Sequence, residues 1–553
     1  MGLAFGYPVR VTTTTDVDSS GDTGHTDEDR KLQRHLGFWH LTAIGFSGVI
    51  GSGWLLGAAA AAQAAGPASM FTWLIGGAAL LLVALVMVEL GASRPESGGL
   101  VRWPFYSNGR LVATLIGWGI WVAYATNPPS EAAALLQYAD HYIPGVYDAD
   151  KASLTTAGTF AAIGIMAVLV ALNWFSVKLF ARVNSLLTIF KFVIPALTAI
   201  LLLASGFDGS HYSNPGGVAP YGWSAALSAI ATAGIIYAYT GFQGPIDLSG
   251  EAKNPKRDVP WAVITALVLS MLVYLALQAS FLSAVPDSAL LHGWKGVNFD
   301  SPYAHLATLL GLGWLSTLLY VDAVVSPGGS ALVFTAETSR ESYGMAKNGF
   351  FPKSIARVHG GSGVPRRALL LNFVIGLAFL LPFRSWQSIV AATSELGLFA
   401  YSISAISEAA FRKAQPHRVA GWIKGMRFIA PVSFVIATLI LYWAGWNELK
   451  IALPVLLAAA LVYLWQQGSQ RIGWFDAKAG LWVVGYLLAI LLMSWVGSFG
   501  DGAEDWIPAP WDSVVVAVIG AVTFVAGTRA AAVYLAENPA PEDDDEFEEA
   551  QPG

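Results

Sequence analysis

Two glycine-rich interruptions inside apolar stretches of this chain are the residues best placed to bind a small polar molecule. The first, Gly51-Ser52-Gly53, interrupts the apolar segment Ile44–Gly57. The second interrupts the segment Ile235–Gly250 at Gly241, Gly244 and Pro245. Backbone groups freed by a break in a spanning helix must be satisfied, so such breaks survive only inside protein or beside a cavity. Two breaks in corresponding positions of a chain indicate the binding site of a transporter.

Helix dipoles predict what the two breaks would bind. A helix end carries about half a unit charge, positive at its N-terminus and negative at its C-terminus. Free N–H groups after the first break suit a carboxylate, and the carbonyl groups that end each first half-helix suit an ammonium group. We therefore predict a zwitterionic amino acid as ligand, held by Val49, Gly51, Ser52, Gly53, Tyr239, Thr240, Gly241, Phe242 and Gln243. The alternatives are that the glycines only allow close helix packing and that Gln243 only caps unwound backbone.

Three ionisable residues lie where the chain should cross the membrane, and a charge there costs at least about 2.5–3.5 kcal/mol. Lys191 shares a helix face with Asn184 and Thr188. A lysine removed from water releases its proton more readily, so Lys191 is predicted to couple transport to protons. Asp322 is its candidate partner or an independent proton carrier, and Glu131 is a third candidate. The alternative is a permanently charged structural lysine paired with an acid.

Composition defines the class of molecule that must position these residues. Hydrophobic residues make up 55% of the 553 residues and charged residues 12%, and the mean hydropathy is +0.54. These values predict one polytopic membrane protein in a lipid bilayer. The net charge of −6 depends on the acidic tail Glu542–Glu549 and does not indicate nucleic acid as a partner. With no cysteine and 9 histidines, mostly in tails and loops, we find no enzyme-like cluster and expect no metal or cofactor.

Hydropathy predicts fourteen spanning helices, because about 20 mostly apolar residues are needed to cross a bilayer. The predicted centres lie near Gly51, Leu82, Tyr124, Gly164, Phe190, Gly234, Leu272, Val321, Gly376, Ala400, Ala437, Leu457, Leu488 and Val522. The predicted organisation is a cytoplasmic tail at 1–37, helices one to five at 38–205, helices six to ten at 224–411, helices eleven to fourteen at 427–535, and an acidic cytoplasmic tail at 536–553.

The distribution of basic residues supports this topology. With the N-terminus inside, the outward loops hold, of the 31 lysines and arginines, only Lys151, Lys295, Arg384 and Lys450. An excess of basic residues on the inner side is typical of membrane proteins, so both termini are predicted to be cytoplasmic. The broken helices are then the first and the sixth. Helix one starts inside and helix six starts outside, so the two five-helix repeats would be inverted relative to each other.

Several separated motifs resemble the amino acid–polyamine–organocation (APC) superfamily of transporters. They are GFSGVIGSGWLLG, AGP at Ala65–Pro67, ELGASRPESGG at Glu89–Gly99, YTGFQGPIDLSGEAKNPKRDVP at Tyr239–Pro260 and SPGGSALVFTAETSRESYGMAKNGFFP at Ser326–Pro352. The resemblance covers about Leu36 to Tyr463. It looks strongest to the branch of bacterial aspartate–proton symporters and acidic amino acid permeases. It implies an all-α integral membrane fold, LeuT-like, with a five-plus-five inverted repeat and four further helices.

The resemblance also implies a function for the predicted site. The breaks would bind the backbone of an amino acid, and Phe242 would be an aromatic gate, although a core phenylalanine is the alternative. Lys191 would stand where other members have a sodium site. The implied activity is proton-coupled uptake of an amino acid, preferably aspartate or glutamate, across the cell membrane. An amino acid/amine exchanger is the alternative, and a channel or membrane-embedded enzyme is a further one. Helices eleven to fourteen would be scaffold or the surface of a homodimer.

Overall fold

The computed structural model describes residues 35–95, 98–148, 151, 153–175, 177–297, 299, 301–470 and 474–540. In this part of the chain α-helices dominate, and the described strands form one two-stranded antiparallel hairpin. The predicted all-α membrane class is confirmed. Residues 1–34 of the N-terminal tail and residues 541–553 of the acidic C-terminal tail lie outside the described residues.

The bounds of the elements are as follows. The α-helices are α2 (Phe38–Val49), α3 (Gly53–Ala65), α4 (Ser69–Ser93), α5 (Gly99–Ala125), α6 (Asn127–Ala139), α7 (Thr156–Phe175), α8 (Val177–Gly206), α9 (Gly222–Thr232), α10 (Ile235–Tyr239), α11 (Gly244–Asp247), α12 (Pro255–Ala284), α13 (Pro302–Leu309), α14 (Gly313–Lys347), α15 (Arg366–Leu380), α16 (Trp386–Ala414), α17 (Met426–Trp443), α18 (Trp446–Gln470), α19 (Trp474–Val496) and α20 (Trp511–Glu537). The strands are β1 (Tyr147–Asp148) and β2 (Ser153–Leu154). Short 3₁₀ helices lie at Gly66–Ala68, Gly209–Tyr212, Ser249–Glu251, Asp287–Ala289, Trp294–Gly296 and Pro416–Arg418.

Eight helical segments of the described chain are long and apolar enough to cross a membrane. They are Gly53–Ser93, Thr156–Phe175, Phe180–Gly206, Pro255–Ala284, Gly313–Lys347, Met426–Trp443, Lys478–Val496 and Trp511–Glu537. The remaining predicted spans also contain helices, but several of these helices are divided into shorter pieces. A count of fourteen spans therefore stays a prediction.

Three of the predicted spans are divided differently from the expectation. The third is split at Thr126 into α5 and α6, and the eighth is split into α13 and α14. The sixth is interrupted twice, because α9 ends before Gly234, which has a left-handed φ of 74°, and α10 ends before Thr240. Glycine adopts this backbone conformation at little cost, which explains why the additional interruption falls there. The sequence pattern had indicated only the second of these interruptions.

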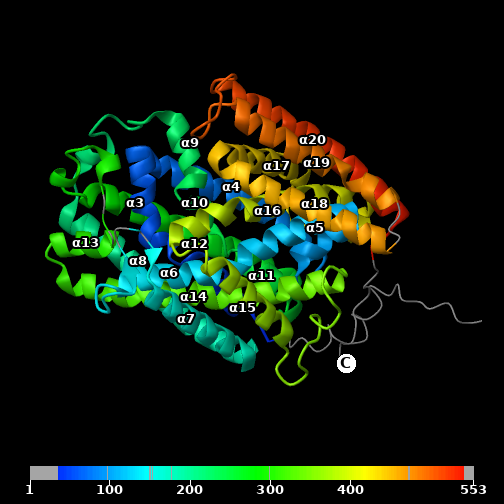
Figure 1. Ribbon diagram of the computed structural model, residues 1–553, viewed down its shortest axis with the longest axis horizontal. Helices are drawn as coiled ribbons and strands as arrows, with labels where there is room; N and C mark the ends of the chain where they lie inside the picture. The colour runs from blue at the N-terminus through cyan, green and yellow to red at the C-terminus, as the bar shows by residue number, and fades with distance from the viewer. Residues whose placement is uncertain are drawn as a thin grey trace, which may run out of the picture.

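The broken helices lie at the centre of the fold. Helix α12 packs against α2, α4 and α8, and α14 packs against α2, α5, α6 and α8. Helices α17 to α20 gather on the side of α5 and α16, away from α3 and α13 (Figure 1). These four helices pack against one another and against α4, α5, α9 and α16, and their interpretation as scaffold or dimer surface stays a prediction.

The start of the first broken helix is joined to the segment that follows the second. Leu36, just before α2, forms a parallel backbone bridge to Ala252, after α11. Its N–H donates to the carbonyl of Glu251 at 3.1 Å, and its carbonyl accepts from the N–H of Lys253 at 2.8 Å. The side chain of Glu251 is buried and accepts from Arg340 on α14 at 2.8 Å. These contacts attach the start of α2 and the end of α11 to α14.

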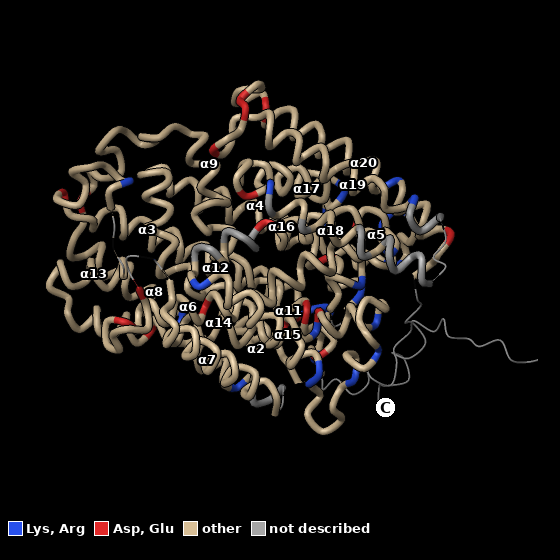
Figure 2. The backbone as a smooth tube through the Cα atoms, in the orientation of Figure 1, with Lys and Arg blue, Asp and Glu red and all other residues tan. Residues whose placement is uncertain are grey.

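Charged residues are distributed unevenly over the molecule. Figure 2 shows lysines and arginines concentrated toward the end of the molecule that carries the C-terminus, whereas acidic residues mark the loop between α19 and α20 at the opposite end. An asymmetry of this kind is expected for a membrane protein whose basic end faces the cytoplasm.

Candidate functional site

The two breaks meet backbone to backbone. Helix α2 ends at Val49 and α10 ends at Tyr239, so Gly48 and Gly241 face each other across the gap. A Cβ atom added to Gly241 would lie 2.3 Å from the carbonyl carbon of Gly48, and one added to Gly48 would lie 2.7 Å from the oxygen of Gly241. Gly241 also has a φ of 117°, which side chains rarely adopt. At these positions glycine is required by close approach as well as by the unwound backbone.

A tyrosine that the sequence analysis did not single out connects the breaks. The hydroxyl of Tyr274, on α12, lies 2.8 Å from the carbonyl oxygen of Val49 and 2.8 Å from that of Ala238. The Val49 carbonyl also accepts from the N–H of Gly51 at 2.9 Å. In this structure Tyr274 and Gly51 therefore satisfy the Val49 carbonyl, and its predicted role in binding a ligand ammonium stays a prediction.

A carboxylate does occupy the first break, but it belongs to the protein. Glu131, on α6, accepts from the N–H of Ser52 at 2.8 Å through Oε2 and from the hydroxyl of Tyr237 at 3.0 Å through Oε1. A Cβ atom on Gly51 would lie 2.4 Å from Oε1, so glycine leaves the room that the carboxylate fills. The N-terminus of α3 thus binds the carboxylate of Glu131 in this structure, and binding of a ligand carboxylate there stays a prediction. Gly53 packs against Ala238 of α10, as the close-packing alternative anticipated.

Polar groups at the second break are satisfied within the protein. Gln243 accepts from the N–H of Gly241 at 2.9 Å and donates to Glu337, on α14, at 3.1 Å. The capping alternative for Gln243 therefore describes this structure. The hydroxyl of Thr240 donates to the carbonyl of Ile236 at 2.8 Å. The hydroxyl of Tyr239 donates to the carbonyl of Trp73 at 3.2 Å.

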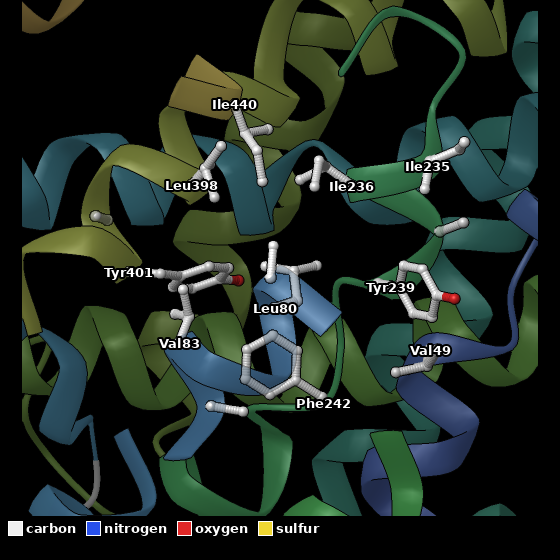
Figure 3. Packing of buried hydrophobic residues seen from close by; sticks show 14 of the residues in the cluster. Val49, Leu80, Val83, Ile235, Ile236, Tyr239, Phe242, Leu398, Tyr401 and Ile440 are labelled. Atoms are coloured by element: carbon white, nitrogen blue, oxygen red, sulfur yellow. The ribbon is translucent and has the colours of Figure 1, made fainter. Parts of the chain in front are cut away.

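Phe242 is fully buried at the second break. Its ring packs edge-on against Tyr401 of α16, with 5.8 Å between the ring centres. Figure 3 shows it among apolar side chains that include Leu80 and Val83, with Val49 and Tyr239 on the other side. In this conformation Phe242 contributes to the core next to the break, so the gate and the core interpretations are not mutually exclusive.

Lys191 contacts the first broken helix. Its Nζ, fully buried on α8, donates to the carbonyl of Ser47 and lies 3.1 Å from the Ser47 hydroxyl. A Cβ atom on Gly329 of α14 would lie 2.9 Å from the same Nζ. The Ser47 carbonyl is available because α2 ends two residues later and Gly51 donates elsewhere. The lysine ammonium therefore lies between α2 and α14.

Asp322 is buried near this lysine but does not pair with it. Its Oδ2 accepts from the hydroxyl of Ser326 at 2.7 Å, and its Oδ1 has no hydrogen-bond partner. Among the described residues, no ion pair within 4.0 Å joins Lys191 to Asp322 or to Glu131. The end of α2 offers the ammonium a closer acceptor than Asp322, so the candidate role of Asp322 as partner of Lys191 or as an independent proton carrier stays a prediction.

Sequence analysis missed a group of buried acids beside the second break. Asp247, Glu337 and Glu341 are all fully buried, and the carboxyl groups of Asp247 and Glu341 lie within hydrogen-bonding reach of each other. Glu337 and Glu341 are four residues apart on α14 and therefore share a face. That spacing was a signal in the sequence. The position of Asp247 opposite them depends on the packing of α11 against α14 and could not be read from spacing alone.

The described residues that could hold a metal lie elsewhere, on the loops after α8 and α12. Asp208, His211 and Asp287 place one ligand atom each within 4.8 Å of one another. His211 Nε2 lies 3.0 Å from Asp287 and 3.8 Å from Asp208. Hydrogen bonds from Ser210 hold the pKa of the Asp208 carboxyl below its ordinary value. The group lies outside the region of the breaks.

Comparison with known proteins assigns the family. An amino acid permease family model matches residues 36–447, which include both breaks and the lysine between them. The chain belongs to the amino acid permease family. The permease is 38% identical over 508 residues to the glutamate/serine transporter AimA of Bacillus subtilis, an alignment covering 90% of this chain and 93% of that protein. It is 36% identical over 494 residues to the aspartate-proton symporter of the same organism, covering 88% and 94%.

A more distant relative extends the family beyond bacteria. The permease is 30% identical over 404 residues to human cationic amino acid transporter 4, covering 70% of this chain and 61% of that protein. The predicted membership of the APC superfamily is therefore confirmed. The permease is an amino acid transporter and not an enzyme.

Proposed function

We propose that the permease takes up an amino acid across the cell membrane together with protons. Relatives that transport glutamate, serine and aspartate support an acidic or small polar substrate. The proposed architecture is the LeuT-like inverted repeat, formed by the first ten of fourteen spans with α2–α3 and α9–α11 as the broken helices. The concentration of basic residues at one end supports cytoplasmic termini.

The contact between Glu131 and Ser52 carries this proposal. An amino acid that binds at the N-terminus of α3 must place its carboxylate where the Glu131 carboxylate now lies, 2.8 Å from the Ser52 N–H. Two anions at one helix end repel each other, so the substrate carboxylate and ionised Glu131 compete. Protonation of Glu131 weakens its hold on the N–H group and releases it to the substrate. Proton binding and substrate binding are thereby coupled at one backbone group.

Lys191 supplies the second element of the proposed cycle. In its charged form it holds the last turn of α2 beside α14 through Ser47. Loss of its proton would remove the charge-assisted bond and loosen α2. Asp322, buried with an unpartnered oxygen, is proposed as the acid that exchanges protons with this region. The proposed substrate site remains the set of break residues, with Phe242 closing it against Tyr401.

Uptake into proteoliposomes tests the proposal. Labelled glutamate, aspartate and serine should accumulate when the lumen is alkaline relative to the outside, and accumulation should collapse with a protonophore. A requirement for a sodium gradient, with no response to the pH gradient, would contradict proton coupling. Uptake that occurs only against internal amine would support an exchanger instead.

A further inference from the structure

A hollow of about 410 Å³ lies on the outer side of the first break. Its wall includes apolar residues of α3, α9 and α16, and Trp386 separates it from the break. The indole Nε1 of Trp386 donates to the Ser52 hydroxyl at 2.7 Å, and its ring packs edge-on against Tyr237. The hollow therefore lies one side chain away from the proposed substrate site, within the 300–1,000 Å³ range of small-molecule pockets.

Two carboxylates from different helices line this hollow. Glu395 of α16 is 3% exposed, and its Oε2 has no hydrogen-bond partner. Glu448, at the start of α18, lines the same hollow and also the adjoining one, which Asp501 lines as well. No lysine or arginine is among the described residues that line either hollow. The nearby base, Lys450, donates to Asn447 at 2.8 Å.

When both acids are ionised, this arrangement favours a positive charge in the hollow. A buried carboxylate oxygen without a donor is costly, and a second carboxylate lining the same hollow increases the cost. Apolar walls around a single sign of charge also focus the field and concentrate counter-ions in the hollow. A cation in the hollow would compensate the charge of both carboxylates, alongside the nearby Lys450.

We propose that Glu395 and Glu448 form an outer cation site, separate from the break site, that binds an ammonium group or an inorganic monovalent cation. The ammonium group would be that of an amino acid waiting in the hollow, with Trp386 between it and the break. The site does not depend on proton coupling, and it can be tested without transport.

The test is a thermal unfolding titration of the purified full-length permease. Methylammonium chloride, sodium chloride and potassium chloride are compared as probes, and Glu395→Gln and Glu448→Gln are compared with the wild type. Glu504→Gln is the matched control, because Glu504 is exposed on the loop between α19 and α20 and lines neither hollow. Comparison of variants at one salt concentration removes the general effect of ionic strength.

A ligand that binds only the folded state raises the unfolding temperature. We expect methylammonium to do so in the wild type and in Glu504→Gln, with the apparent affinity lowered about tenfold or more in the two hollow variants. An equal response to sodium or potassium, lost in the same variants, would identify an inorganic cation as ligand of the same site. Absence of any response in the wild type, or an undiminished response in Glu395→Gln, would overturn the proposal.

Discussion

In the proposed mechanism Glu131 and a bound amino acid compete for the Ser52 N–H, which makes this residue the most direct test of coupling. Glu131→Gln keeps the size of the side chain but cannot ionise. We expect substrate binding in the wild type to strengthen as pH falls, because protonation frees the Ser52 N–H. In the variant, binding should no longer depend on pH in this way. A charge-assisted hydrogen bond is worth about 1.5–3 kcal/mol, so affinity at high pH should rise roughly tenfold or more in the variant.

Binding of labelled substrate to purified protein at pH 6 and pH 8 measures this effect, and Glu504→Gln is again the control. The same variant should lose accumulation driven by a pH gradient. If Glu131→Gln retains both the pH dependence of binding and full accumulation, Glu131 is a structural cap of α3.

The proposed role of Lys191 is tested with two variants that distinguish the effect of its charge from the effect of its ability to release a proton. Lys191→Ala removes the donor to Ser47, and Lys191→Arg keeps a charge that stays protonated near neutral pH. Both variants should lose gradient-driven accumulation by tenfold or more, while Lys191→Ala retains some substrate binding. The measurement is uptake under an imposed pH gradient. Full concentrating activity of the arginine variant would show that the lysine is only structural.

At the scale of the helix, two adjacent glycines of α14 offer a matched pair. A Cβ atom on Gly329 would lie 2.9 Å from Lys191 Nζ and 3.2 Å from the Ser47 hydroxyl, whereas one on Gly328 would meet nothing within 4 Å. Gly329→Ala should displace the flexible lysine end and lower uptake several-fold without unfolding the protein. Gly328→Ala should behave as wild type, since both changes alter helix propensity equally.

The uptake rate and the unfolding temperature are measured for both variants. Together they show whether the contact between Gly329 and Lys191 serves transport or packing. Equal activity of both variants would mean that the position of Lys191 relative to α2 is unimportant. A large fall in the unfolding temperature of Gly329→Ala would instead indicate that the contact is a packing constraint.

The sequence predicts well which segments are helical, because their apolar composition determines this. It also predicts where the two breaks fall, and the structure has interruptions at both places. Glycine and proline weaken a helix, so the clusters of these residues at Gly51 and Gly241 mark the interruptions in the sequence, although Pro195 and Pro327 lie inside continuous helices. The partner of each freed backbone group is not visible. Glu131 reaches Ser52 across 79 residues of sequence, and Tyr274 reaches Val49 across 225. These contacts depend on how helices cross, which tertiary packing determines.

At the scale of the whole molecule, the proposed topology predicts which loops face the outside of the cell. Cysteine labelling tests this prediction. The chain contains no cysteine, so every introduced cysteine is unique. We expect Lys151→Cys and Lys295→Cys, both exposed on predicted outer loops, to react with a membrane-impermeant maleimide on intact cells. Lys353→Cys, exposed on the opposite side, should react only after the cells are permeabilised. Labelling of Lys353→Cys on intact cells would overturn the orientation.

The contacts that join α2 to the segment around α11 bear on the leakage of ions through the permease. The two segments are joined at one end by the bridge between Leu36 and Ala252 and at the other end by the contact of Gly48 with Gly241. Because these segments contact each other at both ends, we expect α2 and α11 to move together. Joint movement disfavours a half-open conformation through which ions could leak. We therefore expect a membrane containing this permease to carry no appreciable current when substrate is absent.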